Sequence, residues 1–141
     1  MKVEIRSQQI AKSSWAFKAF ELYQKKLKHF CDFDFKLLKE GKSLLQNIAP
    51  QDFVILCDER GESLSSKDFA KKVMDLRDSG KKRIVIIVGG PFGADAEVKL
   101  RSNLAISLSS FVMNQEVALI TIFEQIYRAF TIIHNHPYQN E

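Results

Sequence analysis

The chain has 141 residues, a length typical of one domain, and its hydrophobic content of 45% is enough to build a core without disulfide or metal support. Its 21 Lys and Arg residues against 17 Asp and Glu residues give a net charge of +4, which permits an RNA partner without requiring one. No apolar run approaches the roughly 20 residues of a membrane helix, and the first residues, which alternate charged and apolar side chains, are unlike a signal peptide.

In the first part of the chain, strand patterns alternate with helical patterns. Alternating polarity or a short apolar run predicts strands at residues 3–5, 32–38 and 53–57. Apolar residues at helical spacing predict a helix from about Ser14 to Phe30 and a shorter helical piece that ends near Ala49-Pro50. We expect Asp58-Glu-Arg-Gly61 to turn the chain after the third strand.

The second part continues in the same way. Ser65, followed by Asp68, resembles a capping box and predicts a helix that ends at Ser79-Gly80. The β-branched run Ile84–Val88 predicts a strand that is buried on both faces. The spacing of apolar residues further predicts a brief helix at 94–100, a strand at 104–108 and a long helix at 117–131. The alternation predicts one α/β domain over residues 1–141, with a mostly parallel sheet flanked by helices.

The most informative segment is Gly89-Gly-Pro-Phe-Gly93, because it ends the buried strand on glycines. Missing Cβ atoms allow a ligand to approach the backbone closely, and ligands bind at the carboxyl edge of open α/β sheets. The segment has neither the G-x-G-x-x-G order nor a following phosphate-loop lysine. The pattern alone therefore leaves two interpretations open, a ligand loop and a tight structural turn.

No metal site is predicted. Cys31 and Cys57 lack the spacing of ligands and are expected to be reduced thiols in the core of a cytoplasmic protein. His134 and His136 lie beyond the last helix and are interpreted as tail residues. The residues themselves indicate an α/β domain with a small-molecule site near residues 89–93.

Six short motifs then follow one another in order: Leu56-Cys-Asp-Glu-Arg-Gly61, Ser65-Ser66, Val88-Gly-Gly-Pro-Phe-Gly93, Leu104-Ala-Ile-Ser-Leu-Ser109, Glu124-Gln-Ile-Tyr-Arg-Ala129 and His136-Pro-Tyr138. Together they resemble the RlmH family of bacterial 23S rRNA pseudouridine methyltransferases, which belongs to the SPOUT class. The resemblance implies a deep trefoil knot near the carboxyl end that holds S-adenosyl-L-methionine, with S-adenosyl-L-homocysteine as the product. It also implies methylation of pseudouridine N3 in large-subunit rRNA, on assembled ribosomes, by a homodimer whose active site combines groups of both subunits.

Carried over by position, the resemblance implies two sets of site residues. The cofactor would contact Leu56, Gly89, Gly90, Leu108, Ser109, Ser110, Phe111, Val112 and Met113. The candidate catalytic residues are Arg128 for phosphate or base orientation, Tyr138 and His136 for stacking or proton transfer, and Glu124 for orienting Arg128. The terminal helix is apolar nearly all round, which independently favours a two-fold interface.

The chain also departs from this family. Gln115 and Leu119 stand where relatives commonly carry histidine and arginine, and Gln139 and Asn140 stand where further basic residues often follow. Fewer cationic contacts weaken RNA binding that depends on counterion release. Three other functions therefore stay open: a SPOUT methyltransferase for another RNA such as tRNA, a catalytically silent ribosome-binding relative, and an unrelated nucleotide-binding module.

Overall fold

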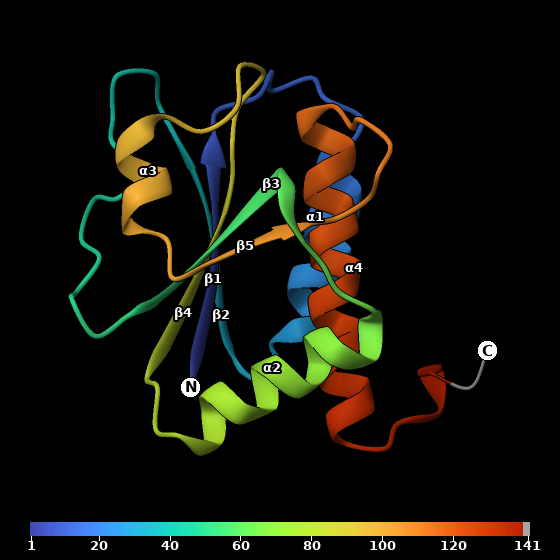
Figure 1. Cartoon of the computed structure of the whole chain (residues 1–141). Helices are drawn as coiled ribbons and strands as arrows, with labels where there is room; N and C mark the ends of the chain where they lie inside the picture. Colours follow the sequence, from blue (N-terminus) through green and yellow to red (C-terminus); the bar gives the residue numbers. More distant parts are fainter. Residues whose placement is uncertain (140–141) are drawn as a thin grey trace.

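Five parallel strands form the centre of the structure, a computed structural model that describes residues 1–139 (Figure 1). Their order across the sheet is β2-β1-β4-β3-β5, and every neighbouring pair is parallel. The strands are β1 (Lys2–Gln8), β2 (Asp32–Leu38), β3 (Phe53–Ser63), β4 (Arg83–Val88) and β5 (Leu104–Ser107). The predicted α/β class with a parallel sheet is confirmed.

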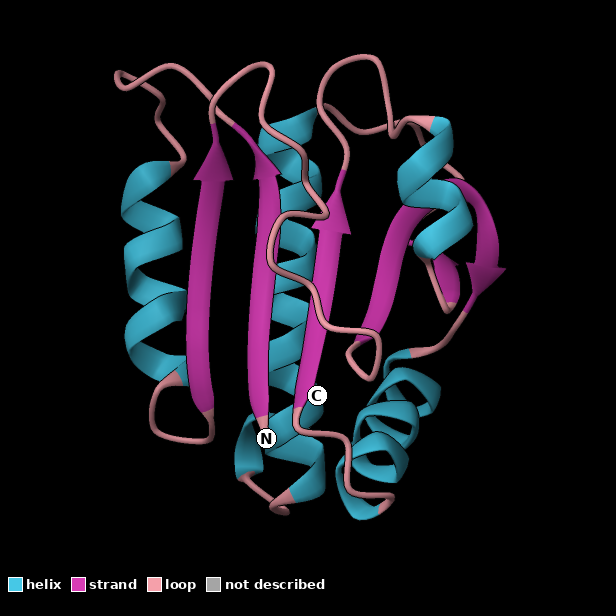
Figure 2. Cartoon of the chain, turned by 90° about the vertical axis from the view of Figure 1, so that its left-hand side faces the viewer, coloured by secondary structure: helices cyan, strands magenta, loops and turns pink. Residues whose placement is uncertain are grey.

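Helices cover the sheet unequally. The helices are α1 (Phe17–Leu27), α2 (Ser66–Asp78), α3 (Ala96–Arg101) and α4 (Gln115–Ile133), followed by the short 3-10 helix η1 (Pro137–Gln139). Helices α1, α2 and α4 lie on one face, whereas α3 and the loop that precedes β3 lie on the other (Figures 1 and 2). No helix among residues 1–139 has both the length and the apolar character needed to cross a membrane.

The central strand β4 separates two apolar clusters. Ile84, Ile86 and Val88 pack into the larger cluster, together with residues of α1, α2 and α4. The intervening Val85 and Ile87 pack into the smaller cluster on the opposite face, against Leu44 and Val98. Because successive side chains of a strand point to opposite faces, this run had to be continuously apolar, and the prediction of a strand buried on both sides is confirmed.

Two arginines, the buried Arg6 and the partly buried Arg83, hold the loop of residues 39–52 against the smaller cluster. The fully buried Arg6 is paired with the buried Glu4 and donates to the carbonyl oxygen of Leu44 over 3.0 Å and to that of Gln46. Arg83 donates to the carbonyl oxygen of Asn47 over 2.6 Å. The prediction of a helical piece before Ala49-Pro50 is wrong: this segment forms hydrogen-bonded turns. A helix would use these carbonyl oxygens for its own hydrogen bonds, but here they accept from Arg6 and Arg83. Asn47 also adopts a positive φ of 58°, which a right-handed helix does not allow.

The expected turn at Asp58-Glu-Arg-Gly61 is also wrong, since β3 continues to Ser63. Cys57 and Glu62 both register with Ile106 of β5, so residues 58–61 bulge out of the ladder within one strand. A Cβ on Gly61 would lie 2.6 Å from the backbone of Ala105 and Ile106. Glycine therefore permits the close approach that lets β3 resume its pairing after the bulge.

The remaining elements follow the predictions apart from their ends. The Ser65 hydroxyl accepts a 3.0 Å hydrogen bond from the Asp68 amide, so the predicted cap of α2 is confirmed. Helix α1 begins at Phe17, three residues later than expected, and α4 extends from Gln115 to Ile133. Both helices pack on the larger cluster, and α4 begins where the sheet presents its carboxyl edge.

Candidate functional site

A cavity of about 690 Å³ lies at the carboxyl ends of β3 and β4. Three segments far apart in the sequence form its wall: the β3 bulge, the glycine segment after β4, and the segment that joins β5 to α4. Its size lies within the usual range of about 300–1,000 Å³ for small-molecule sites, and its position is the one where α/β sheets bind ligands.

The structure brings most of the proposed cofactor-binding residues to this cavity. The residues of this set that line it are Gly89, Gly90, Leu108, Ser109, Phe111, Val112 and Met113. Leu56 lies just outside, fully buried in the smaller apolar cluster, and its neighbour Cys57 reaches the cavity instead. Ser110 is not part of the cavity wall.

The glycine segment folds tightly on itself. The carbonyl of Gly90 accepts a 2.9 Å hydrogen bond from the Gly93 amide, and Gly93 has a positive φ of 79°. A Cβ on Gly89 would lie 2.7 Å from the Gly93 carbonyl carbon and 2.8 Å from the Ala94 nitrogen. The segment is therefore a tight turn, and it also lines the cavity; its role as a ligand loop stays a prediction.

The wall combines apolar surface with charged groups. Val88, Leu108 and Met113 contribute apolar side chains, and Asp58, Glu59 and Glu116 contribute carboxylates beside the cations of Arg60 and Lys99. Burial raises the pKa of the Cys57 thiol to about 12, so the thiol stays neutral at physiological pH. Such a wall suits a partly apolar ligand that carries positive charge.

Sequence reasoning missed the polar part of this wall. Cys57, Asp58, Glu59 and Arg60 line the cavity, although the sequence pattern favours a plain turn there. A signal was available: these residues follow a buried strand directly, at the same sheet edge as the glycine segment. Asn114, Gln115 and Glu116 at the start of α4 were missed as well.

Gln115 joins the start of α4 to the sheet. Its side-chain amide donates to the Ser7 hydroxyl over 2.9 Å and to the Gln8 carbonyl over 2.6 Å, and Ser7 in turn donates to the Val88 carbonyl over 2.6 Å. Asn114 caps the helix by accepting from the Val117 amide over 2.9 Å. Leu119 is fully buried in the core. Gln115 and Leu119 therefore both serve the fold.

The second candidate set surrounds the far end of α4. Arg128 donates to Glu124 through Nε over 3.0 Å and through Nη2 over 3.0 Å. The Tyr138 hydroxyl donates to Glu124 Oε2 over 2.9 Å, and the Arg128 guanidinium lies 5.0 Å from the centre of the Tyr138 ring. Burial and the hydrogen bond to the Glu124 carboxylate raise the pKa of Tyr138 to about 12. These three residues form a connected group, which we call the tail cluster.

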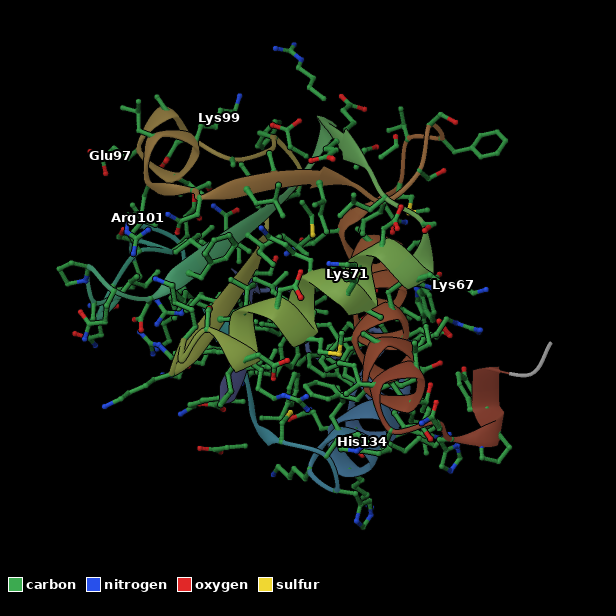
Figure 3. All side chains as sticks on the ribbon, turned by 60° about the horizontal axis from the view of Figure 1, so that its bottom comes forward. Lys67, Lys71, Glu97, Lys99, Arg101 and His134 are labelled. Carbon is green, nitrogen blue, oxygen red and sulfur yellow. The ribbon has the colours of Figure 1, made fainter. Side chains whose placement is uncertain are left out.

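His136 stands beside this cluster. Its Nδ1 accepts a 3.2 Å hydrogen bond from the Tyr138 amide, and its exposed ring meets Phe30 edge-on. His134, labelled in Figure 3, stacks on Phe30 with ring centres 5.3 Å apart. Within residues 1–139, no group of three or more His, Cys, Asp or Glu side chains could hold a metal ion.

One chain does not bring the two candidate sets together. Thirteen positions of α4 separate Gln115, at the cavity, from Arg128 in the tail cluster, or about 20 Å along the helix. Gln139 ends η1, and Asn140 lies outside the described residues. The structure therefore contains a cavity and a charged aromatic cluster at opposite ends of one helix.

Comparisons with known proteins agree on one family. Residues 1–139 match the family described as "Predicted SPOUT methyltransferase". A protein of Bdellovibrio bacteriovorus named ribosomal RNA large subunit methyltransferase H is 43% identical, and the match covers 99% of both chains. Proteins of the same name from Christiangramia forsetii and Dictyoglomus thermophilum are 32% and 42% identical, over 85% and 72% of this chain and 87% and 67% of their own.

Proposed function

Because the chain belongs to the SPOUT methyltransferase family, we propose that it transfers a methyl group from S-adenosylmethionine to N3 of a pseudouridine in large-subunit (23S) rRNA. The large ribosomal subunit as substrate follows the names of the relatives. One observation carries the proposal: the glycine segment after β4 and the segment from Leu108 to Met113 meet in one cavity.

The residues of the cavity suit this cofactor. S-adenosylmethionine carries a positive sulfonium and a positive ammonium group, and Asp58, Glu59 and Glu116 place carboxylates on the wall. Leu108 and Met113 offer apolar surface to an adenine, while the exposed backbone at Gly89 and Gly90 can approach its polar edge. We propose that these residues hold the cofactor, and that Leu56 and Ser110 support the wall from behind.

When bound, the cofactor supplies a methyl group that its sulfonium already activates. The task of the protein is then to orient the acceptor nitrogen and to exclude water, and such alignment corresponds to effective molarities of about 10⁵–10⁸ M. Arg128 can hold a phosphate or the base, because its guanidinium is already oriented by Glu124. Tyr138 is neutral at physiological pH and can donate a hydrogen bond or stack, and His136 is exposed beside it.

We further propose that the chain is threaded through a trefoil knot between β4 and α4. Knots are nearly absent from proteins, so this part rests on family membership. Contact of both segments with one cavity is the arrangement that such a knot produces, since the knotted loops would wrap the cofactor from two sides.

A homodimer would complete the site. The cavity and the tail cluster lie about 20 Å apart along α4, so a second copy running the opposite way along this helix would bring its tail cluster to the cavity. Val117 is 38% exposed, and Ile120 and Ile132 are only partly covered. These apolar side chains supply surface for a two-fold contact. With ribosomes as the substrate, the proposed location is the cytoplasm.

The test is transfer of a labelled methyl group to three substrates: ribosomes that lack the modification, free rRNA and tRNA. We expect transfer to the ribosomes, and mapping of the product should locate the label on N3 of a pseudouridine in large-subunit rRNA. If only tRNA becomes labelled, the protein is a methyltransferase whose substrate is tRNA and not large-subunit rRNA.

The second candidate is a catalytically silent ribosome-binding relative, which the absence of basic side chains at Gln115 and Leu119 favours. It predicts calorimetric binding of S-adenosylhomocysteine and of ribosomes with no transfer to any of the three substrates. If the protein binds neither S-adenosylmethionine nor S-adenosylhomocysteine, both candidate functions are rejected.

A further inference from the structure

The net positive charge of the chain comes from one short segment. Residues 12–28 contain five lysines and one glutamate, a surplus of four that equals the net charge of +4 for the whole chain. The rest of the chain balances sixteen basic residues against sixteen acidic ones. The segment consists of α1 and the loop that leads into it, and it contributed nothing to the candidate site described above.

Four of these lysines point into solvent. Lys12, Lys18, Lys25 and Lys28 are exposed, whereas Phe20 and Leu27 bury the opposite side of α1 in the core. Within residues 1–139 none of the four forms an ion pair. The only tryptophan of the chain, Trp15, stands among them with 64% of its surface exposed. We call these five residues the α1 face.

Helix stability does not explain this arrangement. Lys18 lies in the first turn of α1, where the helix dipole disfavours a cation, and this turn contains no acidic residue. Only the lysines near the last turn interact favourably with the dipole. Trp15 exposes a large aromatic ring beside these cations, and an aromatic ring next to lysines is a combination that suits a partner with both bases and phosphates.

Residues that neighbour the α1 face in the sequence, Ser14 and Lys26, contact the two parts of the proposed site. At one end, the hydroxyl of Ser14, the residue before Trp15, donates to Glu116, which lines the cavity. At the other end, the Lys26 ammonium lies 5.3 Å from the ring centre of Tyr127, which packs edge-on against Tyr138 of the tail cluster. Helices α1 and α4 lie side by side between these ends (Figure 1).

We propose that the α1 face binds the RNA substrate, with the four lysines contacting successive phosphates and Trp15 stacking on an unpaired base. This inference rests on the proposed function. Four exposed cations that form no ion pair within the described part of the chain, with Glu21 as the one exposed carboxylate of the segment, complement a polyanion. Aromatic rings beside cations are the usual means of binding single-stranded RNA. The face also supplies cationic contacts that the chain lacks at Gln115 and Leu119.

The salt dependence of RNA binding tests the lysines. The probe is a fluorescently labelled rRNA stem-loop that contains the mapped base, or a generic stem-loop with an unpaired loop if no base has been mapped. Each lost phosphate contact lowers the slope of log K against log salt by about 0.7–0.9. Replacing Lys12, Lys18, Lys25 and Lys28 with glutamine should therefore reduce the slope by about 3 and weaken binding at least tenfold at about 100 mM salt.

A matched variant controls for the change in net charge. Lys42, Lys67, Lys71 and Lys82 are exposed elsewhere on the surface, two of them on α2 (Figure 3). Their replacement with glutamine should leave the slope within about 1 of the wild-type value. Equal slopes for the two quadruple variants would overturn the proposal. Calorimetric binding of S-adenosylhomocysteine should be the same in both, which shows that each variant is folded.

Trp15 is tested separately, because a second copy of the chain is the other partner that could cover it. Trp15→Ala should weaken stem-loop binding about tenfold and leave the sedimentation coefficient unchanged. A shift to a smaller species without loss of RNA binding would assign Trp15 to a contact between copies and remove it from the RNA face. These experiments measure RNA binding and not methyl transfer. If the wild-type protein transfers no methyl group, the proposed methylation is rejected, and the binding data still test the α1 face independently.

Discussion

The hydroxyl group of Tyr138 donates a 2.9 Å hydrogen bond to Oε2 of Glu124, across the end of the last helix. The same carboxylate accepts hydrogen bonds from Nε and from Nη2 of Arg128, both at 3.0 Å. Glu124 therefore holds both the arginine and the tail, and it fixes the orientation of the guanidinium over the Tyr138 ring. This cluster is built entirely from α4 and the residues after it, so its geometry does not depend on the cavity.

Loss of Arg128 should separate cofactor binding from methyl transfer. Arg128→Ala removes the group that we propose for orienting the RNA. It lies about 20 Å from the cavity of its own chain, and in the proposed dimer its role at the partner's cavity is to hold the RNA and not the cofactor. We expect the affinity for S-adenosylhomocysteine to change less than twofold by calorimetry, while labelled-methyl transfer to ribosomes falls at least about a hundredfold. Arg128→Lys keeps the charge and loses the paired hydrogen bonds, so partial activity should return. Equal loss of binding and transfer would contradict the assigned role.

Tyr138 should remain protonated throughout the working range of the enzyme. Its pKa is raised to about 12 in the folded chain, so the neutral phenol is favoured there, and the stability that it contributes is complete below pH 10 and lost as the pH rises through about 12. Near-ultraviolet absorbance measures the ionisation of tyrosines during a pH titration. The titration curve of the wild type minus that of Tyr138→Phe should show one phenol with a pKa near 12. A midpoint near the ordinary value of 10.0 would mean that the tail does not dock on Glu124.

The outline of the fold was predictable because its signals are local. The alternation in residues 32–38 marks the bounds of β2, and Ser65 with Asp68 marks the start of α2. The errors arose where distant residues decide. Arg6 and Arg83 take the carbonyl oxygens of residues 44–47 from across the fold, and the bulge at residues 58–61 depends on how closely β5 approaches Gly61.

The candidate site was predictable only in part, for the same reason. The glycine segment is recognisable in the sequence because it directly follows a buried apolar strand. Ligand sites of α/β sheets lie at the carboxyl ends of such strands, so its position at the cavity could be predicted. Asp58 and Glu59 follow a buried strand, which indicates the right edge of the sheet, but their contact with the same cavity depends on β3 lying next to β4, and that of Glu116 on where α4 begins. No local pattern reveals these two arrangements. The separation of the tail cluster from the cavity likewise depends on the length of α4 between them.

Asp52 should stabilise the fold in a pH-dependent way. Burial alone would raise its pKa, but hydrogen bonds from Arg83 and the Ala49 amide, with the charges of Arg83 and Arg101, bring the pKa below its usual 3.8. The stability from the Asp52 carboxylate is thus present above this value and is lost as the pH falls through the folded-state pKa. Asp52→Asn should lower the free energy of unfolding by about 2 kcal/mol at pH 7.

Urea unfolding at several pH values measures this difference, which should shrink below about pH 4 as the wild-type carboxyl group becomes protonated. Asp78→Asn is the matched control, because Asp78 is exposed and pairs only with its neighbour Arg77 over 3.2 Å, within the described residues 1–139. Its effect should stay within about 0.5 kcal/mol at every pH. A difference at Asp52 that is constant from about pH 3 to 7 would show that the Arg83 ion pair does not form.

Gly89 should be the glycine on which cofactor binding depends most. An alanine Cβ there would lie 2.7 Å from the Gly93 carbonyl carbon and 2.8 Å from the Ala94 nitrogen, both backbone atoms that cannot rotate away. The segment must then open, which changes the cavity wall, and a strain of about 1–3 kcal/mol corresponds to a tenfold to hundredfold loss of S-adenosylhomocysteine affinity by calorimetry. Gly90→Ala should do less, because its Cβ meets the movable end of the Gln8 side chain.

Gly80→Ala is the control for a general loss of stability. Gly80 has a φ of +87° after α2, where an alanine costs about 1–2 kcal/mol, yet no atom lies within 4 Å of the position that its Cβ would take. We expect Gly80→Ala to lower the unfolding midpoint and to leave the affinity for S-adenosylhomocysteine unchanged. If Gly89→Ala and Gly80→Ala reduce stability alike and neither changes affinity, the glycine segment is a structural turn that does not touch the cofactor.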